Sequence, residues 1–280
     1  MPPIVFADHA PRNVAASRLS VRIEGIGAWT RGAPDWPSMR ALLRGEQGLR
    51  EDAPGKPAAG ALPAAERRRA PEGVLLATEI AAQACAMAAR DAAGLPCVFA
   101  STQGELAITD YMCETLSVAP RELSPTKFHN SVHNAPAGYW TIATGCTAGS
   151  SAVSGYHVTF GAGLLEAAVL AAAEDTPVLF AAYDVAATGP LLEIARISRA
   201  FGMALVLAPC DEAAIPRITL TLRNRPAAIT AAPAAVAALA QDNPLTAHAL
   251  ALLAALAGNT NSRLTLPAAS GLLLDMEICT

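Results

Sequence analysis

The chain has few aromatic residues, little charge and no patterned cysteines. Of its 280 residues, 5% are aromatic and 16% are charged, with a formal net charge of -4. Nucleic-acid binding depends on a basic surface, so this balance excludes a general affinity for nucleic acid. Hydrophobic residues still make up 52% of the chain, many of them alanine. This composition predicts a helix-rich, tightly packed globular protein of one large domain or two small ones.

The six cysteines show neither CxxC spacing nor the pairing of a disulfide scaffold. They stand at positions 85, 97, 113, 146, 210 and 279. We expect reduced core thiols in a soluble, cytoplasmic protein. The first seventeen residues contain no long apolar run and do not form a secretory signal. The most apolar stretch, Gly161 to Ala182, is interrupted by Glu166, Glu174 and Asp175, which argues against a membrane span.

Strand and helix periodicities alternate along the chain, which predicts an α/β protein. The predicted strands cover residues 19–27, 96–100, 152–155, 177–183, 203–209, 216–223 and 271–278. The predicted helices cover residues 37–44, 64–69, 72–93, 105–116, 158–173 and 243–256, and one more begins at a cap on Asn134.

A strand, a sharp turn and a helix are predicted from Ala152 to Ala167. Many enzymes present a nucleophile at such a turn, where the helix dipole and free backbone N–H groups stabilise an oxyanion. His157 stands at this turn. Because the dipole disfavours a protonated imidazole, we expect a neutral His157.

The run from Ser124 to Glu166 carries the most specific pattern. Its Ser124-Pro125, Asn134 and Gly138 match, in register, positions of bacterial β-ketoacyl synthases. The chain resembles this family, within the thiolase-like superfamily, from about residue 18 to residue 225, including the opening segment VRIEGIGAWTRGAPDWPSMRALLRGEQGLR. The resemblance implies a thiolase-like layered α/β fold with a mixed sheet and helices on its faces, mainly the first of the two usual halves.

The resemblance also implies a division of the chain. The expected parts are an N-terminal arm (1–17), a synthase-like N-terminal domain (18–225) and an Ala/Pro-rich connection with a helix and a terminal strand (226–280).

The chain departs from the family where the chemistry would lie. The shared register places His157 on the nucleophilic cysteine and Thr159 on the serine two residues later. An imidazole forms only a labile acyl adduct and is a poor acyl carrier. The family's second half supplies two more histidines, whereas the residues after Arg225 contain only His248, which we expect to be a surface or partly buried helix residue. We therefore expect a chain that is not catalytic alone.

Two segments make the resemblance more specific, because they point to one group of related proteins. FHNSVHNAPAGYWTIATG and FGAGLLEAA are most similar to the short chain-length-factor-like proteins of aryl polyene pathways. Such subunits pair with an active ketosynthase and shape the acyl tunnel at the shared interface. The resemblance implies a subunit of a β-ketoacyl-[acyl carrier protein] synthase complex in polyene, polyketide or fatty-acid-like chain elongation. Its implied partners are an active ketosynthase and acyl carrier protein, in a heterodimer or a homodimer, and it implies no cofactor.

A basic triplet lies on the short predicted helix at residues 64–69. Arg67, Arg68 and Arg69 stand where the family carries basic residues that dock acyl carrier protein. Arginine binds phosphate and carboxylate groups well. An ordinary solvated helix face is an equal alternative, since charge runs are usually surface features.

Five residues are candidates for an interface or tunnel wall. Thr126, Lys127 and Phe128 correspond to family residues that cross the dimer interface and line the partner's tunnel. Phe128 fits such a wall, although an aromatic residue of an α/β protein is more often in the core. Gly161 and Gly163 each cost about 1 kcal/mol of helix propensity relative to alanine, which indicates close backbone packing. Either an internal strand or a partner subunit satisfies that packing.

Other reactive residues have structural interpretations. His129 and His133 are four residues apart, a spacing that binds metals on a helix. They precede the Asn134 cap in a segment predicted to be extended, so we assign them structural roles and expect no metal site. Cys146 precedes the strand rather than its turn, which favours a core thiol. Ser154 and its neighbours do not form a GxSxG elbow.

Two other functions stay open. His157 can serve as the base for a nearby serine in an acyl-thioester hydrolase or acyltransferase, because the turn and dipole are kept. The small residues from Ala152 to Gly163 can instead form a flat surface, as in a self-associating acyl-binding scaffold.

Overall fold

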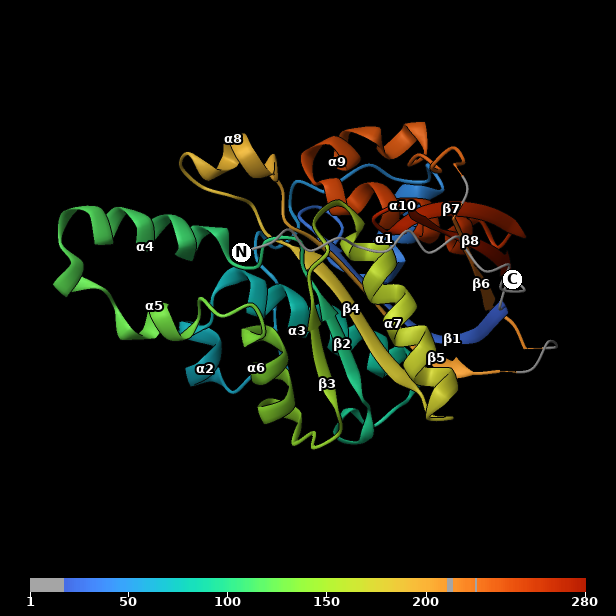
Figure 1. Cartoon of the computed structure of the whole chain (residues 1–280), viewed down its shortest axis with the longest axis horizontal. Coiled ribbons are helices and arrows are strands. Elements are labelled where there is room, and N and C mark those ends of the chain that lie inside the picture. Colours follow the sequence, from blue (N-terminus) through green and yellow to red (C-terminus); the bar gives the residue numbers. More distant parts are fainter. Residues whose placement is uncertain (1–17, 211–213, 225) are drawn as a thin grey trace, which may run out of the picture.

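The computed structural model describes residues 18–210, 214–224 and 226–280. The expected N-terminal arm at 1–17 lies outside these residues. The described strands form one mixed sheet in the order β3-β2-β4-β5-β1-β6-β8-β7 (Figure 1). They are β1 (Arg18–Thr30), β2 (Cys97–Ala100), β3 (Ser150–Val153), β4 (Val178–Asp184), β5 (Phe201–Pro209), β6 (Arg217–Arg223), β7 (Ser262–Ala269) and β8 (Leu272–Cys279). β2 runs parallel to β3 and β4, and the other pairs are antiparallel.

Helices connect these strands and cover the sheet. The α-helices are α1 (Trp36–Leu43), α2 (Ala64–Arg69), α3 (Glu72–Ala88), α4 (Leu106–Val118), α5 (Pro125–His129), α6 (Ala135–Thr144), α7 (Thr159–Ala173), α8 (Leu191–Ala195), α9 (Ala237–Asp242) and α10 (Pro244–Gly258). Short 3-10 helices are η1 (Ala92–Gly94), η2 (Pro120–Glu122), η3 (Tyr156–Val158) and η4 (Ala234–Val236).

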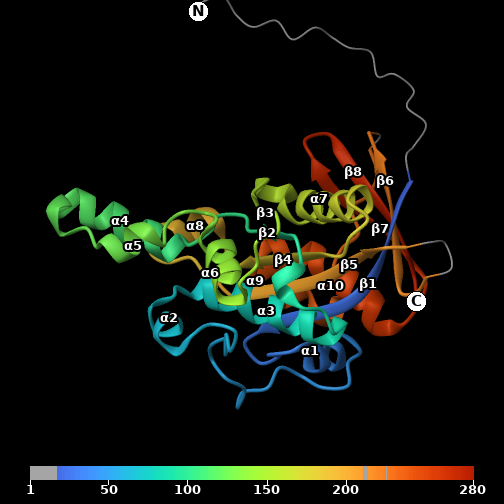
Figure 2. The ribbon, with the colours of Figure 1, turned by 90° about the horizontal axis from the view of Figure 1, so that it is seen from below.

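The central strands are apolar throughout because both faces of the sheet are covered. Along β4, Val178 and Phe180 join the core cluster of α7, whereas Leu179 and Ala181 join the cluster of α3. Figure 2 shows α3 and α7 on opposite sides of the sheet. The alternation of side chains along a strand thus divides the core into two layers.

The carboxyl-terminal elements complete the core on the α7 side. β6, β8 and β7 extend the sheet beyond β1, and α7 packs against β7. The fully buried Leu250, Leu252 and Leu253 of α10 belong to the same cluster as α7 and α1. Residues 226–280, as far as they are described, therefore fold onto the preceding part of the chain.

Helix α7 is apolar along most of its length because one side of it lies within this core, while Glu166 and Val169 on its other side are exposed. By length and composition alone, Tyr156–Ala173 is a candidate membrane span. Its Phe160, Leu164 and Ala167 are fully buried between the sheet and the carboxyl-terminal elements. This burial accounts for its composition.

The structure differs from the sequence-based expectations at several places, among them two short helices, α8 and α9, that were not predicted. Helix α3 ends at Ala88 rather than at residue 93, because Ala89 adopts a left-handed conformation with φ 51°. Strand β7 was not expected, since Pro267 interrupts its alternation, but a proline is tolerated in an edge strand. The segment before Asn134 is not extended, because α5 occupies residues 125–129.

Candidate functional site

The turn between β3 and α7 has the geometry expected for presenting a reactive side chain. Tyr156 adopts φ 54°, the left-handed region that non-glycine residues rarely occupy. The Thr159 hydroxyl donates to the Tyr156 carbonyl at 2.7 Å and accepts from the Gly155 N–H at 3.0 Å. These bonds hold a sharp turn, and its next residue, His157, is exposed.

His157 has an aromatic neighbour but no paired nucleophile. Its ring lies 3.9 Å from the Tyr156 ring, centroid to centroid. The nearest candidate hydroxyls are engaged elsewhere, since Ser154 Oγ donates to the Thr102 carbonyl and Thr159 Oγ1 to that of Tyr156. Within residues 18–210, 214–224 and 226–280, no hydroxyl or thiol is hydrogen-bonded to the His157 ring. The arrangement therefore lacks the nucleophile–base contact of covalent acyl transfer.

A second histidine reaches this turn from the carboxyl-terminal helix. His248, on α10, lies beside His157, and both residues line a small cavity at this turn. Burial lowers the pKa of the His248 imidazole, and its interaction with the backbone of His157 opposes that effect. The expected partly buried helix position is observed, but the proximity to His157 was not predicted. No local pattern signals a contact between residues so distant in sequence.

A cavity of about 320 Å³ opens beside His157. Its walls come from the loop at Thr102 and Gln103, from η3, from α8 and the following turn, and from Pro244 at the start of α10. The lining mixes apolar groups with the charged Glu193 and Arg196. Folding thus brings four separate segments around the position where a family member would carry its nucleophile.

Asp184, at the end of β4, fixes one wall of this cavity. Its Oδ1 accepts hydrogen bonds from Ser101 Oγ at 2.7 Å and from the Thr102 N–H at 2.9 Å. Burial raises the pKa of the fully enclosed Asp184 carboxyl, while these donors lower it. The carboxyl group therefore acts as an internal support for the loop that carries Thr102.

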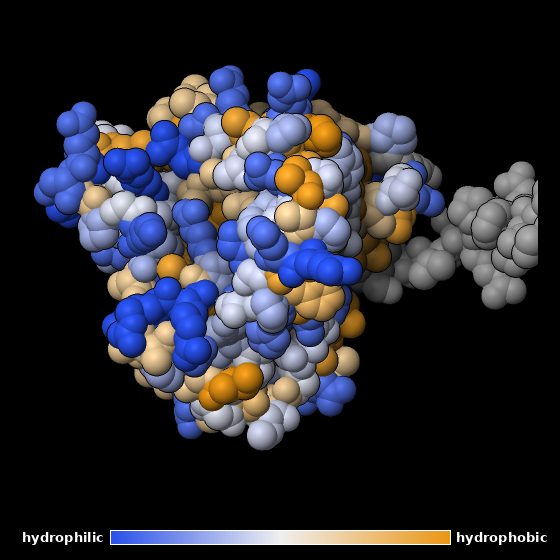
Figure 3. Space-filling model, turned by 90° about the vertical axis from the view of Figure 1, so that its left-hand side faces the viewer, coloured by the Kyte–Doolittle hydropathy of each residue, from blue (hydrophilic) through white to orange (hydrophobic). Residues whose placement is uncertain are grey.

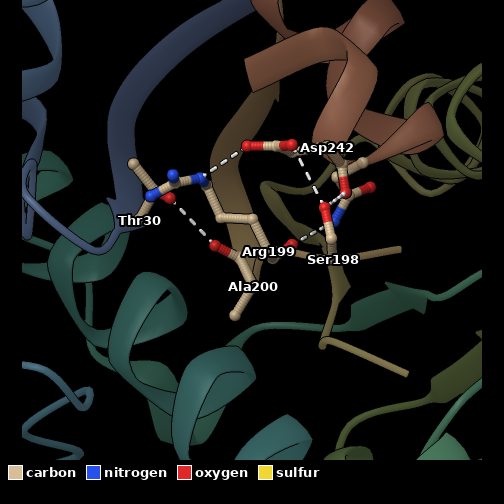
Figure 4. A network of polar contacts seen from close by, with 6 residues as sticks. Thr30, Ser198, Arg199, Ala200 and Asp242 are labelled. Carbon is tan, nitrogen blue, oxygen red and sulfur yellow. Dashed lines mark hydrogen bonds and ion pairs between the residues drawn. The ribbon is translucent and has the colours of Figure 1, made fainter. Parts of the chain in front are cut away.

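Residues 198–200 follow the cavity-lining residues of α8 in the chain and make polar contacts with neighbouring elements. Arg199 Nε donates to Asp242 Oδ2 at 3.0 Å, and Ser198 Oγ donates to Asp242 Oδ1 at 3.1 Å. Thr30 Oγ1 donates to the Ala200 carbonyl at 2.9 Å (Figure 4). Residues 198–200 are thereby held between β1 and the end of α9.

The buried cysteines offer no substitute nucleophile. Burial raises the pKa of the Cys85 and Cys97 thiols to about 12. The buried Cys146 donates to the Leu95 carbonyl at 3.3 Å, in agreement with a core thiol. Because the thiolate is the reactive form, Cys85 and Cys97 are inert near neutral pH. The described part of the chain contains no disulfide.

The basic triplet lies at the end of α2, a helix without buried residues. Arg67, Arg68 and Arg69 are all exposed. Arg69 pairs with Glu66 at 2.9 Å. The other two guanidinium groups stand in solvent, which fits both a docking surface and an ordinary helix face.

Thr126, Lys127 and Phe128 are exposed on α5. Lys127 Nζ lies 3.4 Å from the centroid of the Tyr111 ring, a cation–π contact. Phe128 is 58% exposed, so it is not a core aromatic. Phe128 lies next to residues of α6, with which it lines a groove.

An apolar groove of about 780 Å³ lies between α2, α5 and α6. Phe128, Val132 and Ile142 line it, and Ile142 is 85% exposed. In Figure 3, which views the molecule from this side, apolar residues are interspersed with strongly hydrophilic ones. The groove was not predicted from the sequence. The feature that indicates it is helix α6, which is apolar on all sides but only partly buried. Such a helix is expected to pack against a partner.

Strand β3 is an open edge of the sheet. It pairs with β2, and no described strand pairs with its other side. Its residues, Ser150 to Val153, include no lysine, proline or bulge of the kind that protects edge strands. The open edge and the groove therefore form two unpartnered features of the same part of the molecule.

Gly161 and Gly163 have internal neighbours. A Cβ on Gly161 would lie 2.1 Å from the Pro267 carbonyl oxygen, and one on Gly163 would lie 2.9 Å from the Phe180 ring. The close packing indicated by the sequence is thus satisfied by β7 and β4. Because Thr159 to Gly163 is largely buried, the expected flat surface from Ala152 to Gly163 does not exist as such.

His129 and His133 lie on different local structures, at the end of α5 and in the turn before α6. His133 Nε2 hydrogen-bonds the Ser101 carbonyl at 2.9 Å, the structural role expected for it. The described part of the chain contains no group of three or more His, Cys, Asp or Glu residues that could hold a metal.

The mixed sheet between two helical layers and the sharp turn before α7 define the fold class, and comparison with known families identifies it. Residues 43–270 match the family model of the β-ketoacyl synthase N-terminal domain. The chain belongs to this family. A search of curated proteins finds no match.

Solved structures show the same fold. A ketosynthase (ApeO) in complex with its chain length factor (ApeC) from Xenorhabdus doucetiae matches with a TM-score of 0.71 at 20% identity, covering 92% of this chain and 99% of that chain. The ishigamide ketosynthase/chain length factor matches with a TM-score of 0.58 at 14% identity, covering 93% and 99%. A β-ketoacyl synthase from Burkholderia phymatum STM815 matches with a TM-score of 0.58 at 14% identity, covering 84% and 71%. The expected thiolase-like fold, one half of the usual two, is confirmed.

Proposed function

We propose that this chain is a non-catalytic ketosynthase-like subunit of the chain-length-factor type, which pairs with an active ketosynthase. The observation that carries this proposal is His157 at the turn, without a hydroxyl or thiol bonded to it in the described residues. An acyl chain must be held by a nucleophile during condensation, so another subunit has to supply one.

Two surface features support pairing. The open edge of β3 offers unpaired backbone groups to a strand of a partner. The neighbouring groove exposes Phe128, Val132 and Ile142, which a partner would remove from water. The family resemblance makes the partner an active ketosynthase and gives Thr126, Lys127 and Phe128 the role of interface or tunnel wall.

The substrate is proposed to be a chain growing on acyl carrier protein, as in polyene, polyketide or fatty-acid-like elongation. Arg67, Arg68 and Arg69 support this, because exposed guanidinium groups suit an acidic carrier protein. The resemblance of FHNSVHNAPAGYWTIATG and FGAGLLEAA to chain-length-factor-like proteins of aryl polyene pathways favours such a pathway. We place the pair in the cytoplasm, where reduced thiols such as those of Cys85 and Cys97 persist.

The hydrolase or acyltransferase alternative receives no support from the turn. It requires a serine hydroxyl in contact with His157, and Ser154 Oγ is instead bonded to the Thr102 carbonyl at 2.9 Å. We therefore argue only for the subunit function.

Co-expression with an active ketosynthase tests the proposal. The pair should condense acyl groups on carrier protein, and neither subunit alone should do so. His157→Ala should leave the activity of the pair unchanged, because His157 holds no acyl group. As the control, replacement of the partner's nucleophilic cysteine should abolish it. Robust condensation by this chain alone, or its loss in His157→Ala, would contradict the proposal.

A further inference from the structure

Residues 106–129, comprising α4, η2 and α5, extend from the body of the molecule (Figures 1 and 2). We refer to them as the projection. Within it, only Leu106 and Ile108 are buried, and Leu116 and Val118 are exposed. A helical segment with so little core of its own is held mainly by its attachments to the body.

The two ends of the projection meet at Ser101. At the first end, Gly104 N–H donates to Ser101 Oγ at 3.0 Å, and Glu105 Oε2 accepts from Gly73 N–H at 2.8 Å. At the second end, His133 Nε2 hydrogen-bonds the Ser101 carbonyl at 2.9 Å. Glu105 thus joins the projection directly to the first turn of α3.

The half-buried Glu105 lines a narrow cavity. The cavity between the two ends measures about 10 Å³ and is lined by Glu105, His133 and Tyr183. Such a volume holds about one water molecule. The titratable groups around the carboxyl are Glu72 on α3, His133 at the second end, and Tyr183 with Asp184 at the end of β4. None of them is a permanent cation that would offset an ionised Glu105.

We propose that Glu105 is a protonation-controlled clamp: its neutral carboxyl keeps the projection closed against α3, and its ionised form favours an opened attachment in which water reaches the carboxylate. Opening separates Glu105 from Gly73, and the projection then moves on its remaining attachments. One of these, between Thr188 Oγ1 and Asp110 Oδ2 at 2.8 Å, is exposed to solvent and holds it weakly.

The pH range over which the clamp opens follows from the pKa of Glu105 in the closed and open forms. Burial raises the pKa of Glu105 to about 7 from 4.5, with the Gly73 hydrogen bond lowering it and Glu72 raising it. The closed form therefore binds the proton more tightly, and its stability is fully present below pH 4.5 and is lost as pH rises through 7. Proton linkage makes opening about tenfold more favourable at pH 8 than at pH 6.

The effect on pairing rests on the proposed function. The projection carries Phe128, which forms part of the groove wall. An opened projection would misplace that part of the partner surface, so pairing should weaken as Glu105 ionises.

Hydrogen exchange of the isolated full chain tests the clamp. After correction for intrinsic exchange, the protection factors of amides in residues 106–129 should fall about tenfold from pH 6 to pH 8. Glu105→Gln keeps the acceptor for Gly73 without an ionisable proton, so its protection should not depend on pH. Glu114→Gln, an exposed change on the same projection, should behave as the wild type. Equal pH dependence in Glu105→Gln and the wild type would overturn the proposal.

Two further measurements keep the clamp and the proposed function separate. Carboxyl ¹³C NMR of the wild type should show Glu105 titrating near pH 7, with a midpoint shared by the protection of the projection. A midpoint near pH 4.5 would overturn the clamp even if Glu105→Gln failed to fold. Pairing with the ketosynthase should be stronger at pH 6 than at pH 8. Pairing equally strong at both values would refute the coupling, whereas no pairing at either value, with the exchange as expected, would contradict the proposed function alone.

Discussion

At Gly161, helix α7 approaches strand β7 until backbone touches backbone. A Cβ at this position would lie 2.1 Å from the Pro267 carbonyl oxygen, a distance that real structures do not contain. Glycine lowers the helix propensity of α7, but it lets the helix lie under the carboxyl-terminal part of the sheet. The residue thus serves packing inside the chain.

Gly161→Ala should lower the free energy of unfolding by about 1–3 kcal/mol, because the added methyl group forces α7 and β7 apart. Gly138 in α6 provides the control, since nothing lies within 4 Å of an added Cβ there. Gly138→Ala should raise stability by about 0.5–1 kcal/mol through helix propensity. Urea denaturation followed by circular dichroism measures both changes. An unchanged free energy of unfolding in Gly161→Ala would mean that α7 and β7 are not in close contact at this position in solution.

At the scale of elements, the start of α10 connects three parts of the fold. The buried Asn243 accepts from the Leu245 N–H at 3.0 Å and so caps α10. Its amide donates to the Arg199 carbonyl at 3.1 Å and to the Asp184 carbonyl at 3.4 Å. One side chain therefore fixes α10, which carries His248, against the ends of β4 and β5.

Asn243→Ala should cost about 1–3 kcal/mol of stability, because it removes a helix cap and leaves buried carbonyl groups without their donor. Asn134→Ala is the matched control. Asn134 stands at the same position of α6 but makes no capping hydrogen bond with its side chain. Thermal or urea unfolding should therefore show almost no effect for Asn134→Ala. Similar losses in both variants would refute the special role of Asn243.

At the scale of the whole molecule, the unpartnered features gather at one end of the sheet. The open edge of β3 and the groove beside α6 lie there, and the projection extends from the same side (Figure 1). The opposite end is made by β7, which Thr230 contacts through a backbone bond to the Thr265 carbonyl. The molecule thus has one end suited to association.

Ile142→Asp should abolish pairing with the ketosynthase and leave the isolated chain as stable as before, because the side chain is 85% exposed. A charge placed in an apolar interface has to be desolvated without compensation. Val169→Asp, an exposed change on α7 at the other face of the sheet, should not affect pairing. Analytical ultracentrifugation of mixtures compares the variants. Normal pairing of Ile142→Asp would place the interface elsewhere.

The amino-acid sequence by itself determined the alternation of strands and helices and the turn that presents His157. These follow from local periodicity, from glycine and proline positions and from a register shared with a known family. The start of a helix at Asn243 could also be predicted from the sequence, because many helices begin with an asparagine followed by a proline. In contrast, β7 was not predicted, because Pro267 interrupts the strand pattern and is acceptable only in a strand at the edge of a sheet.

The tertiary structure alone decided which residues meet. It brought His248 to His157, gave Gly161 and Gly163 internal neighbours, and placed the half-buried Glu105 where the projection joins the body. It also left the side chain of Ile142 exposed on α6, although the sequence of this helix resembles that of a core helix. Burial and contact depend on how distant segments pack, and local pattern carries no information about that packing.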